Sequence, residues 1–243
     1  MDRRAVADII QRGGTILKTS RAPEFREVGY QKIAAENLEA YDIEGLVVIG
    51  GDGSFRGAKD LTDNCGIMTV GIPGTIDNDL AYTDFTLGFD TAVNTALSAI
   101  NNLRDTMTSH ERVCIVEVMG RKCGDIALYA GLGGGAEVII VPEVHNDIAQ
   151  IAKSIAVNKR KGKTSDIIVL AEGVCRAVEL KQQLKDQGIT SSIKTTELGY
   201  IQRGGAPTMP DRLPAAHFGA RAVAVLREGT GPLRVGLTEH RLV

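Results

Sequence analysis

The sequence predicts an α/β protein built on open, mainly parallel sheets. Short apolar runs recur along the chain, and each is followed by glycines and polar residues and then by a stretch of helical character. Near-continuous apolar runs of this kind are typical of strands buried on both faces of a parallel sheet. Alternating strands and helices imply a doubly wound arrangement. The predicted strands are Leu46–Ile49, Ile67–Ile72, Val113–Val118, Val138–Val141 and Ile167–Ala171.

The clearest helix is predicted over Thr91–Arg104, because its apolar residues recur with helical spacing and share one face. A break between domains is expected near Phe89–Asp90, where this helix begins after a glycine-containing loop. A return crossing is expected near Gly199–Gly205. In open α/β sheets, ligands bind outside the carboxyl ends of the strands. The unusual polar residues of this chain follow the predicted strands, so we expect them to form a site.

Composition excludes several classes of protein. The 243 residues are 43% hydrophobic and carry a formal net charge of -2, without the basic stripe of a nucleic-acid binder. No apolar run approaches the roughly 20 residues of a membrane span, and the N-terminus lacks the apolar segment of a secretory signal. None of the four cysteines forms a C-x-x-C pair, which favours reduced thiols over a zinc site. We therefore expect a cytoplasmic protein that binds neither nucleic acid nor membrane.

The segment Gly50-Gly51-Asp52-Gly53-Ser54 follows the first predicted strand. Glycines let backbone amides approach a phosphate, and a neighbouring carboxylate can hold Mg²⁺. The alternative is a tight turn from strand to helix. The segment is not a dinucleotide fingerprint, because Arg56 stands where the last glycine is required, and the chain's Gly162-Lys163-Thr164 lacks the first glycine of a P-loop.

The segment Pro73-Gly74-Thr75-Ile76-Asp77-Asn78-Asp79 follows the second predicted strand. Alternate residues of an extended segment share a face, so Thr75, Asp77 and Asp79 could point the same way. A hydroxyl for a phosphoryl oxygen, a base and a second carboxylate make a coherent kinase site. A polar loop that caps a helix is the alternative interpretation.

Three further polar positions are candidates. Met119-Gly120-Arg121 ends a strand, and Arg121 could neutralise charge on a transferred phosphoryl group. Arg203, between flexible residues of Gly199–Gly205, could bind a phosphate, although a solvated loop charge explains it equally well. Glu172 ends a buried strand, where a sugar hydroxyl, an arginine or a backbone amide would satisfy its carboxylate.

Together these motifs resemble the ATP-dependent 6-phosphofructokinases of the bacterial type. The glycine-rich loop alone also occurs, in variant form, in NAD kinases and lipid kinases. The segment Pro73–Asp79, combined with Met119–Arg121 and Gln202-Arg203-Gly204-Gly205, is far more specific. The resemblance runs through nearly the whole chain. It implies two Rossmann-like lobes with three α/β/α layers each: residues 1–89 plus 201–243 as the larger, nucleotide-binding lobe, and 90–200 as the smaller, sugar-phosphate-binding lobe.

The resemblance also implies roles for individual residues. Asp77 would be the base that takes the proton from the 1-hydroxyl of fructose 6-phosphate, with Thr75 and Arg121 stabilising the transferred group. ATP would bind as co-substrate through Arg21, Gly51, Asp52, Gly53 and Ser54, with Asp52 holding Mg²⁺. The substrate-binding residues would be Thr75, Asp77, Asp79, Arg112, Met119, Gly120, Arg121, Glu172, Lys194, Tyr200 and Arg203.

Two further properties follow from the resemblance. Pyrophosphate-using relatives carry Asp where Gly53 stands and Lys where Gly74 stands, so ATP is the expected donor. A homotetramer is expected, in which Arg112 reaches the sugar-phosphate site of a neighbouring subunit. An allosteric nucleotide site would include Arg104, Gly135, Glu137, Lys161 and Lys163, for which a solvated basic turn is the alternative.

The chain departs from the family pattern in three ways. The chain lacks the family's first strand with its glycine-rich turn and the family's closing helices, which suggests truncation at both ends. Lys194 and Tyr200 stand where the bacterial enzymes carry Arg and His around the 6-phosphate. A lysine keeps the charge but loses the bidentate fork, and a tyrosine keeps one donor. A non-catalytic or regulatory chain that binds sugar phosphate without turnover therefore remains the alternative function.

Overall fold

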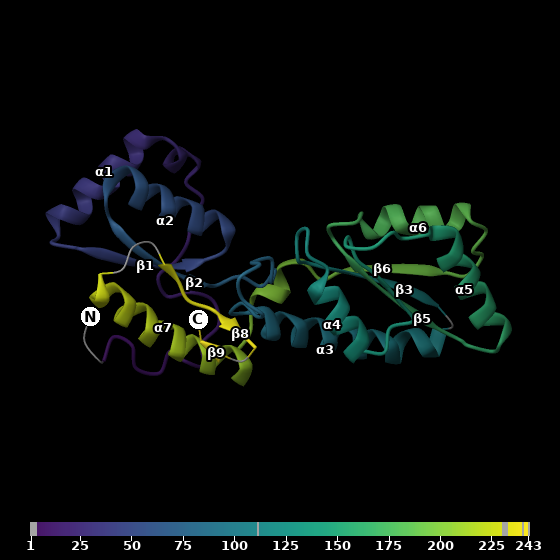
Figure 1. Cartoon of the computed structure of the whole chain (residues 1–243). Helices are drawn as coiled ribbons and strands as arrows, with labels where there is room; N and C mark the ends of the chain where they lie inside the picture. The colour runs from purple at the N-terminus through teal and green to yellow at the C-terminus, as the bar shows by residue number, and fades with distance from the viewer. Residues whose placement is uncertain (1–3, 111, 230–232, 240, 243) are drawn as a thin grey trace. The chain divides into compact units, whose positions relative to one another are not determined.

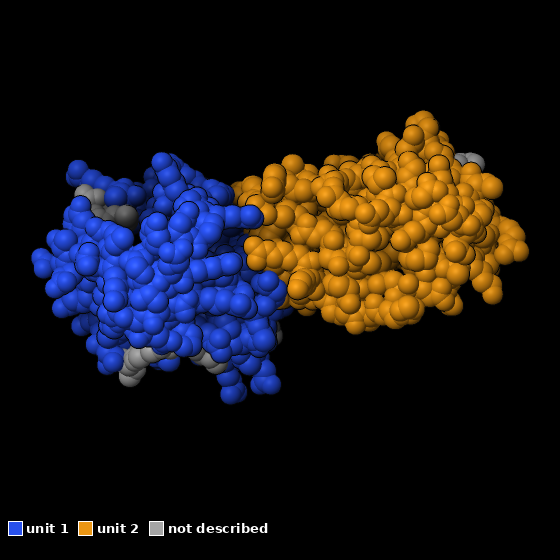
Figure 2. All heavy atoms as spheres, turned by 90° about the horizontal axis from the view of Figure 1, so that it is seen from above, with its two compact units in different colours: residues 1–75, 79–88, 207–243 blue, residues 76–78, 89–206 orange. Residues whose placement is uncertain are grey.

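The computed structural model describes residues 4–110, 112–229, 233–239 and 241–242. The chain divides into two compact units, coloured separately in Figure 2. Unit 1 comprises residues 1–75, 79–88 and 207–243, and unit 2 comprises residues 76–78 and 89–206. Each unit has its own sheet and its own core, and each is described by itself below.

The sheet of unit 1 is parallel, with strand order β1-β2-β7. Helices α1 and α2 lie on one side of it and helix α7 lies on the other (Figure 1). A short 3-10 helix, η1, precedes α1, and an antiparallel pair, β8 and β9, ends the described chain. The bounds are η1 Pro23–Arg26, α1 Val28–Ala40, β1 Gly45–Gly50, α2 Asp52–Cys65, β2 Met68–Pro73, α7 Met209–Glu228, β7 Leu233–Arg234, β8 Leu237–Thr238 and β9 Arg241–Leu242.

Alternate residues of β2 face the two helical layers of unit 1. Val70 and Ile72 are buried in a cluster with Phe218 of α7. Gly71 points to the other side, where a Cβ atom would lie 2.7 Å from the Phe55 ring of α2. The glycine thus lets α2 pack closely on the strand whose end continues into Thr75.

The sheet of unit 2 is also parallel, with strand order β4-β5-β3-β6. Four helices and a 3-10 helix, η2, surround it (Figure 1). The bounds are α3 Phe89–His110, β3 Val113–Val118, α4 Asp125–Gly133, β4 Val138–Ile140, α5 Ile148–Arg160, β5 Asp166–Ala171, α6 Ala177–Asp186, β6 Ile193–Glu197 and η2 Gly199–Arg203.

Both faces of this second sheet are buried, as the near-continuous apolar runs predict. Cys114, Val116 and Val118 of β3 pack in one cluster with residues of α3 and α4. Val113 and Ile115, the alternate residues, pack in a second cluster with residues of α5 and α6. Unit 2 therefore has three layers, with its sheet in the middle.

The structure confirms the predicted fold class and places a strand at each of the five predicted positions. The predicted helix over Thr91–Arg104 lies within the longer α3. The chain changes unit between residues 88 and 89 and between 206 and 207, whereas the expected lobes change at 89/90 and 200/201. The short excursion of residues 76–78 into unit 2 was not anticipated. None of the described helices is long and apolar enough to span a bilayer.

Candidate active site

Asp77 and Arg121 form an ion pair in unit 2. The Nε atom of Arg121 lies 3.1 Å from the Oδ2 atom of Asp77. The Asp77 side chain is 7% exposed, whereas that of Arg121 is 62% exposed. A buried carboxylate paired with a cation is suited to accept a proton from a substrate hydroxyl.

Arg121 lies in a turn with an unusual backbone. Gly120 has φ +135° and Arg121 has φ +53°, and the second value lies in the left-handed region that non-glycine residues seldom adopt. Such a conformation costs about 1–3 kcal/mol and persists only when its surroundings enforce it. A Cβ atom at Gly120 would also collide with the backbone oxygen of Cys123, so only glycine fits there.

Side chains from the neighbouring strand ends hold this turn. The Oε1 atom of Glu172, directly after β5, accepts hydrogen bonds from the backbone N–H of Gly120 at 3.2 Å and of Arg121 at 2.9 Å. The Oε1 atom of Gln202, in η2 after β6, accepts from the N–H of Met119 at 3.3 Å. Because β3 lies between β5 and β6, both acceptors reach its end.

Asn78 fixes the segment that carries Asp77. Its φ of +53° is also left-handed, a conformation that asparagine tolerates better than most residues. Its Nδ2 atom donates to the Oδ2 atom of Asp125, the first residue of α4, at 2.7 Å. The carboxylate of Asp77 is thereby anchored to the helix that follows the Arg121 turn.

The 3-10 helix η2 carries an exposed arginine that contacts a neighbouring aromatic ring. The guanidinium carbon of Arg203 lies 4.6 Å from the centroid of the Tyr200 ring, and both side chains are exposed. A guanidinium over an aromatic face is stabilised by the ring quadrupole. This contact between Tyr200 and Arg203 is one that the sequence did not reveal.

Arg112 and Lys194 lie at the opposite end of the unit 2 sheet. Arg112 directly precedes β3, and Lys194 pairs in register with Cys114 near the start of that strand. Met119 is five positions after Cys114, a distance of roughly 16 Å along a strand. Within one chain, the structure does not bring these two cations together with Arg121 or Arg203.

The glycine-rich turn of unit 1 leads from β1 into α2. Gly51 is the N-cap of α2, so the amides of the helix's first turn point outward at its positive end. A Cβ atom at Gly50 would collide with the Ser54 side chain, so this glycine makes room for the hydroxyl. A Cβ at Gly51 would lie 3.4 Å from the Thr75 side chain, so Thr75 lies beside the turn.

Asp52 is the candidate magnesium ligand. Its carboxylate pairs with Arg56, with Nη2–Oδ2 at 2.9 Å and Nε–Oδ1 at 3.2 Å, and is 49% exposed. Mg²⁺ often uses a single carboxylate together with water and phosphate oxygens, so this accessible carboxylate fits the ion once Arg56 moves aside. Among the described residues, three or more metal-ligating side chains do not gather anywhere.

A pocket of about 460 Å³ in unit 1 adjoins this carboxylate. It also contains Asp79, the last carboxylate of the second motif, and the cations Arg56, Lys59 and Arg234. Asp79 is exposed and belongs to unit 1, whereas Asp77 belongs to unit 2. Arg21, expected at the nucleotide, is exposed and precedes η1, whose Phe25 packs on Gly57 of α2.

The two glycines thought to select the phosphoryl donor differ in their surroundings. A Cβ at Gly53 would meet nothing within 4 Å, so the space beside it is open. A Cβ at Gly74 would lie 2.8 Å from the Cγ2 atom of Ile49. The absence of a side chain at Gly74 is therefore also a requirement of packing against β1.

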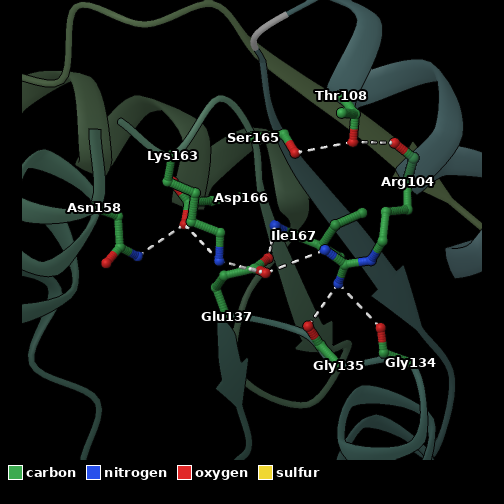
Figure 3. A network of polar contacts seen from close by, with 10 residues as sticks. All are labelled: Arg104, Thr108, Gly134, Gly135, Glu137, Asn158, Lys163, Ser165, Asp166 and Ile167. Atoms are coloured by element: carbon green, nitrogen blue, oxygen red, sulfur yellow. Dashed lines mark hydrogen bonds and ion pairs between the residues drawn. The ribbon is translucent and has the colours of Figure 1, made fainter. Parts of the chain in front are cut away.

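Most of the predicted allosteric residues form a network of polar contacts in unit 2 (Figure 3). Glu137 Oε1 accepts from Arg104 Nη1 at 3.1 Å and from Lys163 Nζ at 2.7 Å. Arg104 Nη2 donates to the backbone oxygens of Gly134 at 3.0 Å and Gly135 at 2.6 Å, at the end of α4. Lys161 is exposed and caps α5 outside these contacts.

Burial and hydrogen bonding have opposite effects on the pKa values of Glu137 and Asp166, the two carboxylates of this network. Burial alone would raise the pKa of Glu137, but hydrogen bonds from the Ile167 N–H, Lys163 and Arg104 outweigh it and lower the pKa. At Asp166, burial dominates and raises the pKa, although Asn158 and Lys163 favour the charged form. Lys163 thus pairs with Glu137 while its side chain stays 39% exposed.

Known proteins resemble the chain closely. A family model described as phosphofructokinase matches residues 1–226. The chain belongs to the phosphofructokinase family. The motifs Gly50–Ser54, Pro73–Asp79 and Met119–Arg121 all lie inside the matched range.

Individual phosphofructokinases show how far the similarity extends. The chain is 57% identical over 244 residues to the ATP-dependent 6-phosphofructokinase of Clostridium tetani, with 100% of the chain and 76% of the relative covered. It is 56% identical to ATP-dependent 6-phosphofructokinase 1 of Clostridium perfringens, covering 100% of the chain and 75% of that relative.

Solved phosphofructokinase structures share the fold. The phosphofructokinase from Saccharomyces cerevisiae aligns with a TM-score of 0.89 and 32% identity, covering 100% of this chain and 37% of the yeast chain. A pyrophosphate-dependent phosphofructokinase from Marinobacter aquaeolei aligns with a TM-score of 0.83 and 26% identity, covering 99% of this chain and 65% of the other. An enzyme named as pyrophosphate-dependent is thus among the proteins that share this fold.

Proposed function

We propose that the chain transfers a phosphoryl group from MgATP to the 1-hydroxyl of fructose 6-phosphate, with Asp77 as the general base. The observation that carries this proposal is the buried Asp77 carboxylate, 3.1 Å from the Arg121 guanidinium, at the carboxyl end of the unit 2 sheet. An acceptor for the hydroxyl proton and a cation for the phosphoryl oxygens are the two groups that this reaction needs.

In the proposed reaction, the substrate's 1-oxygen attacks the γ-phosphorus while its proton passes to Asp77. The bond from the γ-phosphorus to the bridging oxygen breaks, and ADP leaves with that oxygen. Arg121 and the Thr75 hydroxyl stabilise the charge on the transferred group. Magnesium, when held by Asp52, would neutralise the charge of the nucleotide phosphates. We assign Arg203 to the 6-phosphate, and Met119, Gly120 and Glu172 to the sugar.

The donor assignment depends on the turn at the start of α2. Gly51, Gly53 and Ser54 offer outward-facing amides and a hydroxyl to phosphates, and the relatives with 53–57% identity are named ATP-dependent enzymes. The open space beside Gly53 supports a nucleotide over pyrophosphate. A coupled assay comparing the two donors tests this assignment. Turnover with pyrophosphate and none with ATP would overturn it.

We further propose that sugar-phosphate sites are shared between copies of the chain. Arg112 and Lys194 lie at the opposite end of the sheet from Arg203, so they can serve such a site only on another subunit. Mixing the Asp77→Asn and Arg112→Ala chains tests this, because a shared site predicts that the mixture regains activity that neither variant has alone. Failure of every mixing ratio to restore turnover, with oligomers confirmed, would contradict it.

The remaining candidates are assigned by proposal as well. Arg21 would contact the nucleotide phosphates, and Asp79 would lie near the magnesium ion. Tyr200 would act on the 6-phosphate through Arg203. Arg104, Gly135, Glu137, Lys161 and Lys163 would bind a regulatory nucleotide. Binding of fructose 6-phosphate without turnover on any donor would favour a regulatory chain over an enzyme.

A further inference from the structure

Three successive backbone amides at the end of β3 each donate to a side chain from a neighbouring strand end. Glu172, after β5, accepts hydrogen bonds from the backbone N–H groups of Gly120 and Arg121, at 3.2 and 2.9 Å. Gln202, after β6, accepts a hydrogen bond from the backbone N–H of Met119 at 3.3 Å. Glu172 is expected at the sugar from the sequence, but no role has been given to Gln202.

Gln202 differs from its neighbours in η2 by being buried. It is 1% exposed, whereas Tyr200 and Arg203 on either side of it are exposed. A side chain so enclosed has no access to a sugar phosphate. Any effect of Gln202 on the reaction must therefore pass through the groups that it binds.

Both ends of the Gln202 amide are used. Its Oε1 atom accepts from the Met119 N–H, and its Nε2 atom donates to the backbone oxygen of Gly199 at 3.1 Å. Gly199 begins η2, which carries Tyr200 and Arg203, and Met119 begins the turn that carries Arg121. One buried amide thus joins the segment assigned to the 6-phosphate to the segment assigned to the transferred phosphoryl group.

We infer that Gln202 is a positioning residue, which fixes the distance between the Arg203 segment and the Arg121 turn through its two hydrogen bonds. A sugar held by its 6-phosphate then presents its 1-hydroxyl at a set distance from Asp77. This inference rests on the proposed function. Hydrogen bonds to a planar amide restrict both distance and direction, which apolar packing alone would not do.

Gln202→Met is the variant that tests this role, because methionine keeps the approximate volume and removes both hydrogen bonds. Gln31→Met is the matched control. Gln31 is also 1% exposed, and its amide also makes two hydrogen bonds, to Phe25 and Asn64, but it lies in unit 1. A general loss of stability should appear in both variants.

The inference predicts that Gln202→Met raises KM for fructose 6-phosphate and lowers kcat, each by about tenfold, the effect of one hydrogen bond. KM for ATP should change no more than in Gln31→Met. Equal kinetic changes in the two variants, or unchanged kinetics in Gln202→Met, would overturn the inference.

Amide hydrogen exchange provides a second readout that needs no activity. In the wild-type chain the amides of residues 119–121 should be protected, and Gln202→Met should accelerate exchange at Met119 while Gln31→Met leaves it unchanged. Unprotected amides in the wild type would overturn the inference even if Gln202→Met fails to fold. A wild type that shows this protection but neither binds nor phosphorylates fructose 6-phosphate would instead refute the proposed function.

Discussion

Arg121, whose guanidinium pairs with Asp77, has a left-handed backbone conformation. Nε of Arg121 lies 3.1 Å from Oδ2 of Asp77, while the Arg121 backbone has φ +53°. Because the Asp77 carboxylate is only 7% exposed, Arg121 also compensates the burial of its charge, which a pair on the open surface would not do. This stabilisation can offset the backbone cost of the left-handed turn, about 1–3 kcal/mol. The proposed catalytic role is a second explanation for the turn.

Replacing Arg121 with lysine separates these two explanations. Lysine keeps the charge but loses the planar fork, so kcat should fall by about 10²-fold while the melting temperature changes little. Steady-state kinetics and thermal unfolding measure the two effects. Arg221→Lys is the control, because Arg221 is also an exposed arginine paired with a carboxylate, Glu228, at 3.2 Å. A similar small effect on kcat in both variants would leave the pair as a surface contact.

Two substitutions at Tyr200 distinguish stacking from hydrogen bonding. If the ring orients Arg203, Tyr200→Phe should bind fructose 6-phosphate like the wild type, and Tyr200→Ala should bind it about 2–5-fold more weakly. Isothermal titration calorimetry measures the affinities. A loss of affinity in Tyr200→Phe as large as in Tyr200→Ala would show that the hydroxyl, and not the ring, makes the contact.

The two glycines near the nucleotide segment should respond differently to substitution. Gly53→Asp enters open space, so its melting temperature should stay near that of the wild type while ATP turnover falls. Gly74→Ala should be less stable by about 1–3 kcal/mol, because its Cβ atom meets Ile49. Denaturant unfolding compares them. Equal stability of Gly74→Ala and the wild type would refute the packing argument.

Glu137 should make stability depend on acid. Its pKa in the folded chain lies below the usual 4.5, so its contribution is present above that value and is lost as pH falls through the lowered pKa. The stability gap between wild type and Glu137→Gln should therefore narrow on acidification below about pH 4.5. Urea unfolding at several pH values measures it. A gap that widens toward low pH would contradict the lowered pKa.

Much of the fold is predictable from the sequence because the signal is local. The run Val113–Val118 is apolar except at Glu117, and the structure buries all six of its residues. The polar segments after the strands are also recognisable locally, because glycines and carboxylates stand together directly after an apolar run. Arg121 and Glu172 meet in unit 2 because the parallel neighbours β3 and β5 place their carboxyl ends side by side.

What the sequence did not reveal depends on which strands are neighbours. Gln202, Asn78 and Asp125 make contacts across 83 or 47 residues of chain, and no local pattern marks them. Likewise, Lys194 and Tyr200 are only six positions apart, and both are predicted to lie at the 6-phosphate. Lys194, however, lies at the start of β6 and Tyr200 follows its end, so the strand places them at opposite ends of the sheet. The separation of residues 76–78 from both flanking segments also has no local signal.

The most direct test of the account is the turnover of Asp77→Asn with MgATP and fructose 6-phosphate. Asparagine keeps the shape of the side chain but cannot take the hydroxyl proton, so kcat should fall by about 10²–10⁴-fold. Fructose 6-phosphate should still bind, and Asp147→Asn, at the exposed N-cap of α5, should turn over like the wild type. Full activity in Asp77→Asn would contradict the assignment of Asp77 as the base.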